Sequence, residues 1–442
     1  MAERQRPTTG RSPTVSRRAF LAASGAGALA LTGCGTGFGL RGQDGAGSTE
    51  GRLSFTLWAG EAELAAFTAI AEDWSRGSGL PVRFNVVPFG ELLTGVDANL
   101  ASDRAPDLFR ITYQDIGLYA AGGALLDVTD RLPAGFADGF GEAFRRAVTH
   151  DDRLYGVPHH TDTSMVLYDV DALSAAGVAA PTALDDAWSW EEFVDVAGRL
   201  PVGDGRFAFG VNWQQAGAYR WLNFVEQRGG RFLDDDLTGP AIDSAAGREA
   251  LAFTQRFFSE GLVPPTTSTK GSYVDELFSS GTIAMVFAND YLLPTLDPAL
   301  TEQGRRLGAT FLPRDEVASA DLGGTAVVAT AASANAEAAA DFLAFLSGDE
   351  AQARFCEEAV VLPTRTALTG QPLAYAVRPE LMELFIEQAT VITPTLTEQV
   401  TIPQFNALNA ALVDRLEQAF LGGDDPGAVL ADLSQDVEGR LS

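Results

Sequence analysis

The sequence predicts an α/β protein built on a parallel sheet with helices on both faces. Strand-like and helix-like patterns alternate along residues 53–111 in the order strand, helix, strand, helix, strand. Turn signals such as Ala59-Gly60 separate these segments. A β-α-β order of this kind requires parallel strands joined by crossover helices. The length of 442 residues is sufficient for two domains rather than one.

The first five elements follow from side-chain periodicity. Residues 53–58 (LSFTLW) alternate apolar and polar side chains, which is typical of a strand. Residues 61–76 place an apolar face at helical spacing and therefore predict an amphipathic helix. That face consists of Leu64, Phe67, Ile70, Ala71 and Trp74. We then expect a strand at 81–87, a helix at 90–102 and a strand at 106–111.

The second half of the chain contains more helix. The clearest helical patterns lie at residues 190–200, 248–261, 273–280, 336–346 and 407–420. Short apolar strands are expected between them, at 207–212, 283–287 and 326–330.

Ligands of open α/β sheets bind outside the carboxyl ends of the strands. This rule selects the residues that follow each predicted strand of the first half. Trp58, Gly60 and Glu61 follow the first strand, and Tyr113, Gln114 and Asp115 follow the third.

The N-terminal segment reads SRRAFLAASGAGALALTGC at residues 16–34. A basic head, a short apolar middle and small residues before the cysteine indicate a secretory signal, and the apolar run is too short to span a bilayer. Residues 16–21 resemble a twin-arginine export motif, and residues 31–34 (LTGC) resemble a bacterial lipobox. We therefore expect a signal peptide at 1–33, lipid on Cys34 and a Gly-rich flexible tether at 34–51.

This segment also predicts location. A protein lipidated at Cys34 would be extracytoplasmic and held at the cell membrane by acyl chains, without a spanning helix. If Cys34 carries lipid, Cys356 is the one remaining cysteine of the two in the chain, so no internal disulfide can form.

The charge excludes one class of partner. The net charge is −28, and removal of residues 1–33, which hold five Arg and one Glu, brings it to −32. Such a chain is repelled by nucleic acid and by anionic lipid headgroups, so we expect no nucleic-acid partner and membrane contact through the lipid anchor alone.

Motifs for metal, cofactor and enzyme chemistry are missing. His159 and His160 resemble half a metal site, but His150 is the only other histidine, so zinc is not expected. Asp234-Asp235-Asp236 lacks the glycine and glutamate spacing of a calcium loop. No nucleophile elbow, phosphate-binding loop or dinucleotide fingerprint occurs. We expect no metal, no cofactor and no enzymatic activity, although two cleft carboxylates leave glycoside hydrolysis as an alternative.

From Tyr155 the chain reads YGVPHHTDTSMVLYDVDALSAAGVAAP and then WSWEEFVDVAGRL. This stretch resembles the centre of the extracellular solute-binding proteins of carbohydrate ABC importers, the family of maltose-binding protein. Asp169-Val170 replaces the usual Asn-Lys of the family. Further pieces match the family pattern in order, at residues 277–293, 322–355, 361–365 and 403–441. The resemblance covers nearly the whole chain after the signal segment.

The resemblance implies a two-lobed periplasmic-binding-protein type II fold with a hinge of crossing strands and a ligand cleft between the lobes. It implies crossings near residues 159–164, 286–291 and 322–327. The expected N-terminal lobe comprises residues 52–160 and 290–323, and the C-terminal lobe comprises 161–289 and 324–442.

The resemblance also implies ligand-binding residues, which supply aromatic plates and planar polar groups. They are Trp58, Gly60, Glu61, Tyr113, Gln114, Asp162, Trp213, Trp221, Asn289, Asp290, Tyr291, Gly323, Gly324 and Arg365. Structural alternatives stay open for four of these positions. Trp58 could cap the core, Trp213 and Trp221 could pack the second lobe, and Asp162 could cap a turn.

The implied function is capture of a neutral sugar or oligosaccharide by a monomer, with delivery to an ABC permease and its ATPase. A second ligand class remains possible on the same fold. The carboxylates of Glu61, Asp115, Asp162 and Asp290 would suit a polyamine or another non-sugar solute.

Overall fold

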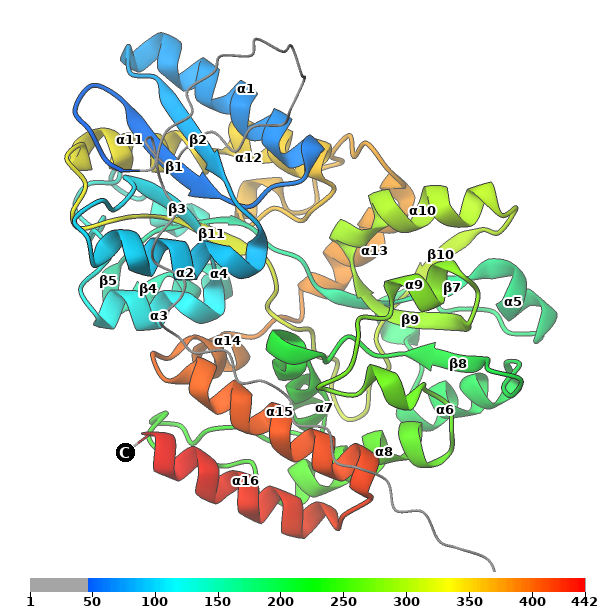
Figure 1. Ribbon diagram of the computed structural model, residues 1–442. Coiled ribbons are helices and arrows are strands. Elements are labelled where there is room, and N and C mark those ends of the chain that lie inside the picture. The colour runs from blue at the N-terminus through cyan, green and yellow to red at the C-terminus, as the bar shows by residue number, and fades with distance from the viewer. Residues whose placement is uncertain (1–46, 442) are drawn as a thin grey trace, which may run out of the picture. The chain divides into compact units, whose positions relative to one another are not determined.

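In the computed structural model of the protein, residues 47–441 are described (Figure 1). The expected signal peptide at 1–33, the lipidation residue Cys34 and most of the tether at 34–51 lie outside the described residues.

The first sheet has five strands in the order β2-β1-β3-β11-β6. Strand β1 runs parallel to β2 and β3, as the sequence predicts, whereas β11 runs antiparallel to β3 and β6. These strands are β1 (Leu53–Leu57), β2 (Val82–Val86), β3 (Leu108–Thr112), β6 (Val157–His160) and β11 (Thr325–Ala329).

Helices cover both faces of this first sheet (Figure 1). α1 packs against α11 and α12 on one face, and α2, α3 and α4 lie on the other. Their bounds are α1 (Glu61–Ser78), α2 (Phe89–Leu100), α3 (Tyr113–Ala121), α4 (Glu142–Ala147), α11 (Ala336–Leu346) and α12 (Asp349–Ala359). A short hairpin of β4 (Thr149–His150) and β5 (Arg153–Leu154) adjoins α3 and α4. The predicted α/β class is confirmed.

The second sheet has four strands in the order β10-β7-β9-β8. Strand β7 is antiparallel to β9 and β10, and β8 is parallel to β9. Their bounds are β7 (Ser164–Asp169), β8 (Phe207–Gly210), β9 (Ile283–Asn289) and β10 (Leu307–Thr310).

The remaining helices belong mainly to the second sheet, and α14 instead packs against α3 and α4. They are α5 (Val170–Ala175), α6 (Trp190–Arg199), α7 (Leu222–Gln227), α8 (Ala245–Ser259), α9 (Asp275–Ser279), α10 (Leu293–Glu302), α13 (Pro379–Ala389), α14 (Pro394–Thr401), α15 (Phe405–Gly422) and α16 (Pro426–Leu441). Short 3₁₀ helices are η1 (Ala137–Gly139), η2 (Leu184–Asp186), η3 (Gln215–Trp221), η4 (Pro265–Thr267), η5 (Asp290–Leu292) and η6 (Thr366–Leu368). α15 and α16 pack on each other and on α8.

The strand pairing corrects part of the expected lobe division. The chain crosses between the sheets at residues 161–163 and again between β10 and β11. It does not cross at 286–291, because η5, α10 and β10 follow β9 and β10 pairs with β7. β10 therefore belongs to the second sheet, whereas the expected division gave it to the first lobe. β11 belongs to the first sheet, because its backbone hydrogen-bonds both β3 and β6.

Candidate ligand-binding site

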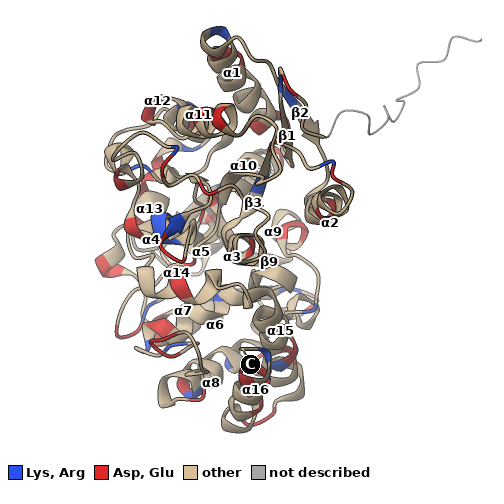
Figure 2. Ribbon diagram, turned by 90° about the vertical axis from the view of Figure 1, so that its left-hand side faces the viewer, with Lys and Arg blue, Asp and Glu red and all other residues tan. Residues whose placement is uncertain are grey.

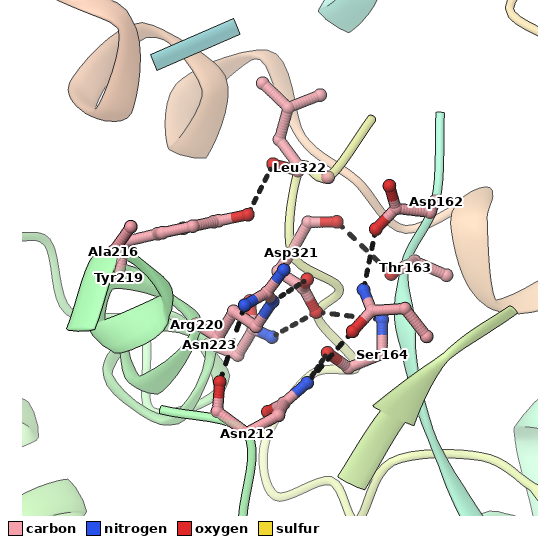
Figure 3. A network of polar contacts seen from close by, with 12 residues as sticks. Asp162, Thr163, Ser164, Asn212, Ala216, Tyr219, Arg220, Asn223, Asp321 and Leu322 are labelled. Atoms are coloured by element: carbon pink, nitrogen blue, oxygen red, sulfur yellow. Dashed lines mark hydrogen bonds and ion pairs between the residues drawn. The ribbon is translucent and has the colours of Figure 1, made fainter. Parts of the chain in front are cut away.

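The two segments that cross between the sheets, residues 161–163 and 321–324, are hydrogen-bonded to each other (Figure 3). The Gly323 backbone N–H donates to the Asp162 carbonyl at 3.1 Å. The Thr163 hydroxyl donates to the Asp321 carbonyl at 3.2 Å. These contacts make the crossing segments one polar unit, and we call it the crossing pair.

Asp321 anchors the crossing pair to the second lobe. Its carboxylate is fully buried and accepts hydrogen bonds from three donors. These are Arg220 Nε at 3.2 Å, the Ser164 backbone N–H at 3.0 Å and Asn223 Nδ2 at 3.3 Å. A buried carboxylate is tolerated when it is paired and hydrogen-bonded in this way.

Arg220 comes from η3, which follows β8 in the second lobe. Its guanidinium lies 5.2 Å from the centre of the Tyr219 ring. The Tyr219 hydroxyl donates to the carbonyl of Leu322 at 3.0 Å, next to Asp321 (Figure 3). One turn of 3₁₀ helix therefore holds the crossing pair with a charge and a hydroxyl.

Asp162 lies at the edge of this network (Figure 3). Its Oδ1 accepts a hydrogen bond from Asn289 Nδ2 at 2.8 Å. Burial, and then the charge of Asp321, raise the pKa of Asp162 to about 6, against the lowering effect of Arg220. The group therefore titrates within the physiological range.

Glycine is required beside Asp162. A Cβ at position 323 would lie 2.1 Å from the Asp162 Oδ1 atom. Gly324 has φ of +89°, a conformation that L side chains rarely adopt. Both glycines, which the sequence proposed for close backbone approach to a ligand, pack closely against the first crossing segment.

Three expected residues lie at the end of β9 and in the η5 turn that follows it. Asn289 is buried, and its Oδ1 accepts a hydrogen bond from Asn212 Nδ2 at 3.1 Å. Asp290 is fully buried, and its Oδ1 accepts the Thr163 N–H at 3.1 Å. Its Oδ2 has no hydrogen-bond partner within residues 47–441. Burial and the Asp162 charge raise the pKa of Asp290 well above its usual value. Tyr291 is 46% exposed.

On the first lobe, Trp58 is partly buried after β1. The Arg110 guanidinium lies 4.6 Å from the centre of its ring, and Arg110 also donates to the Trp58 carbonyl at 2.8 Å. Gly60 and Glu61 are exposed at the start of α1. Gln114, at the start of α3, donates from Nε2 to the Leu322 carbonyl at 2.8 Å. The first lobe therefore reaches the crossing pair directly.

Four expected residues serve packing in this structure. Tyr113 is buried, and its hydroxyl donates to the His160 carbonyl at 2.9 Å. Trp213 and Trp221 are buried in the second lobe, which is the alternative that the sequence left open for them. Trp221 Nε1 donates to Thr254 Oγ1 at 2.9 Å. Arg365 stacks between Phe136 and Phe140 and pairs with Asp349, outside the network.

Two cavities of the protein lie away from the crossing pair. One of about 290 Å³ is bordered by α4, the turn at residues 362–363 and the end of α13. Another is bordered by residues 228–231 and the start of α8. Neither cavity is lined by a residue of the crossing pair. We therefore define the candidate site by the polar side chains around the crossing pair and not by a cavity.

Sequence reasoning missed three residues of this polar network, namely Asn212, Arg220 and Asp321. Arg220 stands between two aromatic residues, Tyr219 and Trp221, and only Trp221 was considered. Asp321 lies two residues before the glycine pair that the sequence did identify. The position of Asp321 beside the expected crossing at residues 322–327 is the sequence feature that could have identified it.

The buried histidines fit a structural role. His159 and His160 are buried, and burial together with the Arg110 charge lowers the pKa of each well below its usual value. Within residues 47–441 no group of three His, Cys, Asp or Glu side chains could hold a metal ion.

Two sheets joined by crossing segments, with polar side chains gathered at the crossing, define the class of two-lobed solute-binding proteins. The family model for bacterial extracellular solute-binding proteins matches residues 58–353, and the chain belongs to this family. Its members are binding proteins of transporters, so the protein is not an enzyme, as the sequence predicted.

Curated relatives and a solved structure agree with this assignment. The galactooligosaccharide-binding protein of Bacillus subtilis is 22% identical over 80% of this chain and 81% of its own. An uncharacterized lipoprotein encoded in the oleD 5′ region of Streptomyces antibioticus is 33% identical over 37% of this chain and 35% of its own. The GacH receptor of Streptomyces glaucescens, solved without ligand and with acarbose, has a TM-score of 0.74, with 22% identity over 88% of this chain and 98% of its own.

The Asp321 contacts generate a stability prediction. We expect Asp321→Ala to lower the free energy of unfolding by about 3 kcal/mol, because it leaves the Arg220 charge buried without its carboxylate. Asp315→Ala removes a partly exposed partner of Arg228 and serves as the matched control, with an expected loss of about 0.5 kcal/mol. Urea unfolding of both variants measures the difference, and equal losses would contradict the anchoring role of Asp321.

Proposed function

We propose that this protein is a lipid-anchored extracytoplasmic receptor that captures a neutral sugar or oligosaccharide between its two lobes. It would act as a monomer and deliver the sugar to the permease and ATPase of an ABC importer.

The observation that carries this proposal is the composition of the site. Asp162 lies beside the amide of Asn289, the last residue of β9, and the half-exposed Tyr291 follows two residues later in η5. Sugars present hydroxyl groups around the ring and apolar C–H faces, which carboxylates with amides and aromatic rings match respectively. The names of relatives support the ligand class, since they include galactooligosaccharide-, arabinooligosaccharide- and maltodextrin-binding proteins.

The geometry suggests how binding would be coupled to the hinge. Gln114 of the first lobe and Tyr219 of the second both donate to the Leu322 carbonyl in the crossing pair. A sugar that contacts both lobes in one arrangement and a single lobe in another shifts the population toward the first. Hinged closure around a ligand is the general behaviour of periplasmic binding proteins.

The membrane anchor rests on the N-terminal sequence. Cys34 follows the lipobox-like residues 31–33, and one relative is named as a lipoprotein. Of the helices in residues 47–441, none is both long enough and apolar enough to cross a bilayer. Acyl chains on Cys34 would supply the attachment.

The ligand class is tested by thermal unfolding of the chain from Gly35 with candidate solutes. The probes are maltotriose, galactotriose, arabinotriose, diacetylchitobiose, spermidine and glucose 6-phosphate. A ligand at about 100 times its Kd stabilises the folded state by about 2.7 kcal/mol, and we expect a sugar to raise the melting temperature accordingly. A response to spermidine alone would contradict the sugar assignment, and consumption of the sugar, followed by mass spectrometry, would contradict a binding role.

The pKa of Asp162 predicts a pH dependence of sugar affinity. The carboxylate accepts sugar hydroxyls when it is ionised, so affinity rises as the pH passes through about 6. At pH 5 we expect a Kd about tenfold weaker than at pH 7. Asp162→Asn would be weaker and flat across this range. Calorimetric titration at both pH values measures the change, and a wild-type Kd independent of pH would contradict ligand contact by Asp162.

The stability of the sugar-free protein should change in the opposite direction. The folded-state pKa of Asp162 exceeds the unfolded value of about 3.9, so the unfolded chain releases its proton first. The contribution of Asp162 to stability therefore decreases between about pH 4 and pH 6. This opposite sign separates a ligand effect from a folding effect.

The anchor is tested with Cys34→Ala in the full chain. We expect the wild type to sediment with membranes and to carry lipid on Cys34 by mass spectrometry, whereas the variant is released. Cys356→Ala, which changes a buried cysteine, is the control and should stay with the membrane. Membrane retention of Cys34→Ala would contradict lipid anchoring at this residue.

A further inference from the structure

We propose that Phe89 is a ligand-contacting residue of the first lobe, and that Trp58 acts through it as a positioning residue. The inference rests on the proposed function and adds a specificity-determining residue to the same site. In it, the ring of Phe89 stacks on the apolar C–H face of a sugar.

Phe89 occupies the position where ligands of such sheets bind. It is the first residue of α2 and follows the carboxyl end of β2, which lies beside β1 in the first sheet. Its side chain is 55% exposed. Its ring packs edge-on against Trp58, with ring centres 4.9 Å apart and planes at 76°. The contact holds Phe89 on one side, and more than half of its side chain stays exposed.

The indole of Trp58 is less accessible to a ligand than its position after β1 suggests. The Arg110 guanidinium lies over its ring at 4.6 Å, and Phe89 packs against the same indole. Arg110 is itself buried and held by Glu63 at 2.7 Å and by Thr325 Oγ1 at 3.2 Å. The buried guanidinium of Arg110 therefore fixes the position of the Trp58 indole. Trp58 would act on a ligand indirectly, because it holds the ring of Phe89 in place.

Position separates Phe89 from other exposed apolar residues, which are ordinary on protein surfaces. Phe345, on α11, is 41% exposed but lies on a helix that covers the first sheet, away from the strand ends of β1 and β2. Phe89 follows the end of a strand and packs against Trp58, which was expected to bind ligand, whereas Phe345 does neither. Phe345 is therefore a matched control of the same residue type and similar exposure.

The chemical consequence is a preference for ligands with an extended apolar face. A sugar ring whose axial hydroxyls do not interrupt the C–H face would cover the exposed part of Phe89, and aromatic contacts of this kind add to the gain from buried area. A second aromatic surface is available on the second lobe at Tyr291, which is 46% exposed.

The test measures Kd by calorimetric titration with whichever of maltotriose, galactotriose, arabinotriose and diacetylchitobiose raises the melting temperature most. We expect Phe89→Ala to weaken binding about tenfold and Phe89→Trp to restore it. Phe345→Ala should bind as the wild type does. The sugar-free melting temperature of Phe89→Ala should be unchanged, because the side chain is more than half exposed.

The role of Trp58 is tested by coupling. If Trp58 acts through Phe89, Trp58→Ala weakens binding to the same extent, and the double variant is no weaker than either single variant. Full additivity would overturn the positioning role of Trp58. Wild-type affinity in Phe89→Ala would overturn the inference while leaving the proposed function intact. If no sugar binds the wild type, both fail.

Discussion

The buried carboxylate of Asp321 is the constraint on which the rest of the site depends. It lies on one segment that crosses between the lobes, and it receives hydrogen bonds from Ser164, beside the other crossing segment, and from Arg220 and Asn223 of the second lobe. A charge taken out of water must be matched by donors at fixed positions. The crossing segments, η3 and the start of β7 are therefore placed relative to one another by the same group. Figure 2 shows acidic and basic residues spread along many helices and loops, whereas the Asp321 side chain is fully buried and that of Arg220 is 17% exposed.

The balance of charge at the crossing explains the protonation states. Asp162, Asp290 and Asp321 are all buried, and the charge of Arg220 acts to lower the pKa of Asp162. One guanidinium offsets one carboxylate. Asp321 makes the direct ion pair, the pKa of Asp162 is raised to about 6, and burial together with the Asp162 charge raises the pKa of Asp290 well above its usual value.

The sequence predicted the first three strands and first two helices because their periodicity is strong, and α1 buries Phe67, Ile70, Ala71 and Trp74 as expected. It could not distinguish aromatic residues of the core from those of the cleft, since both follow strands. Trp213 and Trp221 are core residues here, whereas Phe89 fell at the edge of a predicted helix. The position of β11 could not be read from local patterns either, because it is set by pairing with strands far away in the sequence. The ion pair of Arg220 and Asp321 could not be predicted either, because the two residues lie about a hundred positions apart in the chain and local patterns do not show that they meet.

The position of β11 has a consequence for synthesis. The strand lies between β3 and β6, and its residue Thr325 pairs with Thr112 and His160. On the ribosome, the first sheet would have a gap between β3 and β6 until nearly three quarters of the chain had been translated, and strand pairing over such separations is slow. All strands of the second sheet precede β11 in the chain, so the first sheet, although it begins first, is the last to receive all of its strands. The N-terminal half of the chain cannot complete this sheet alone.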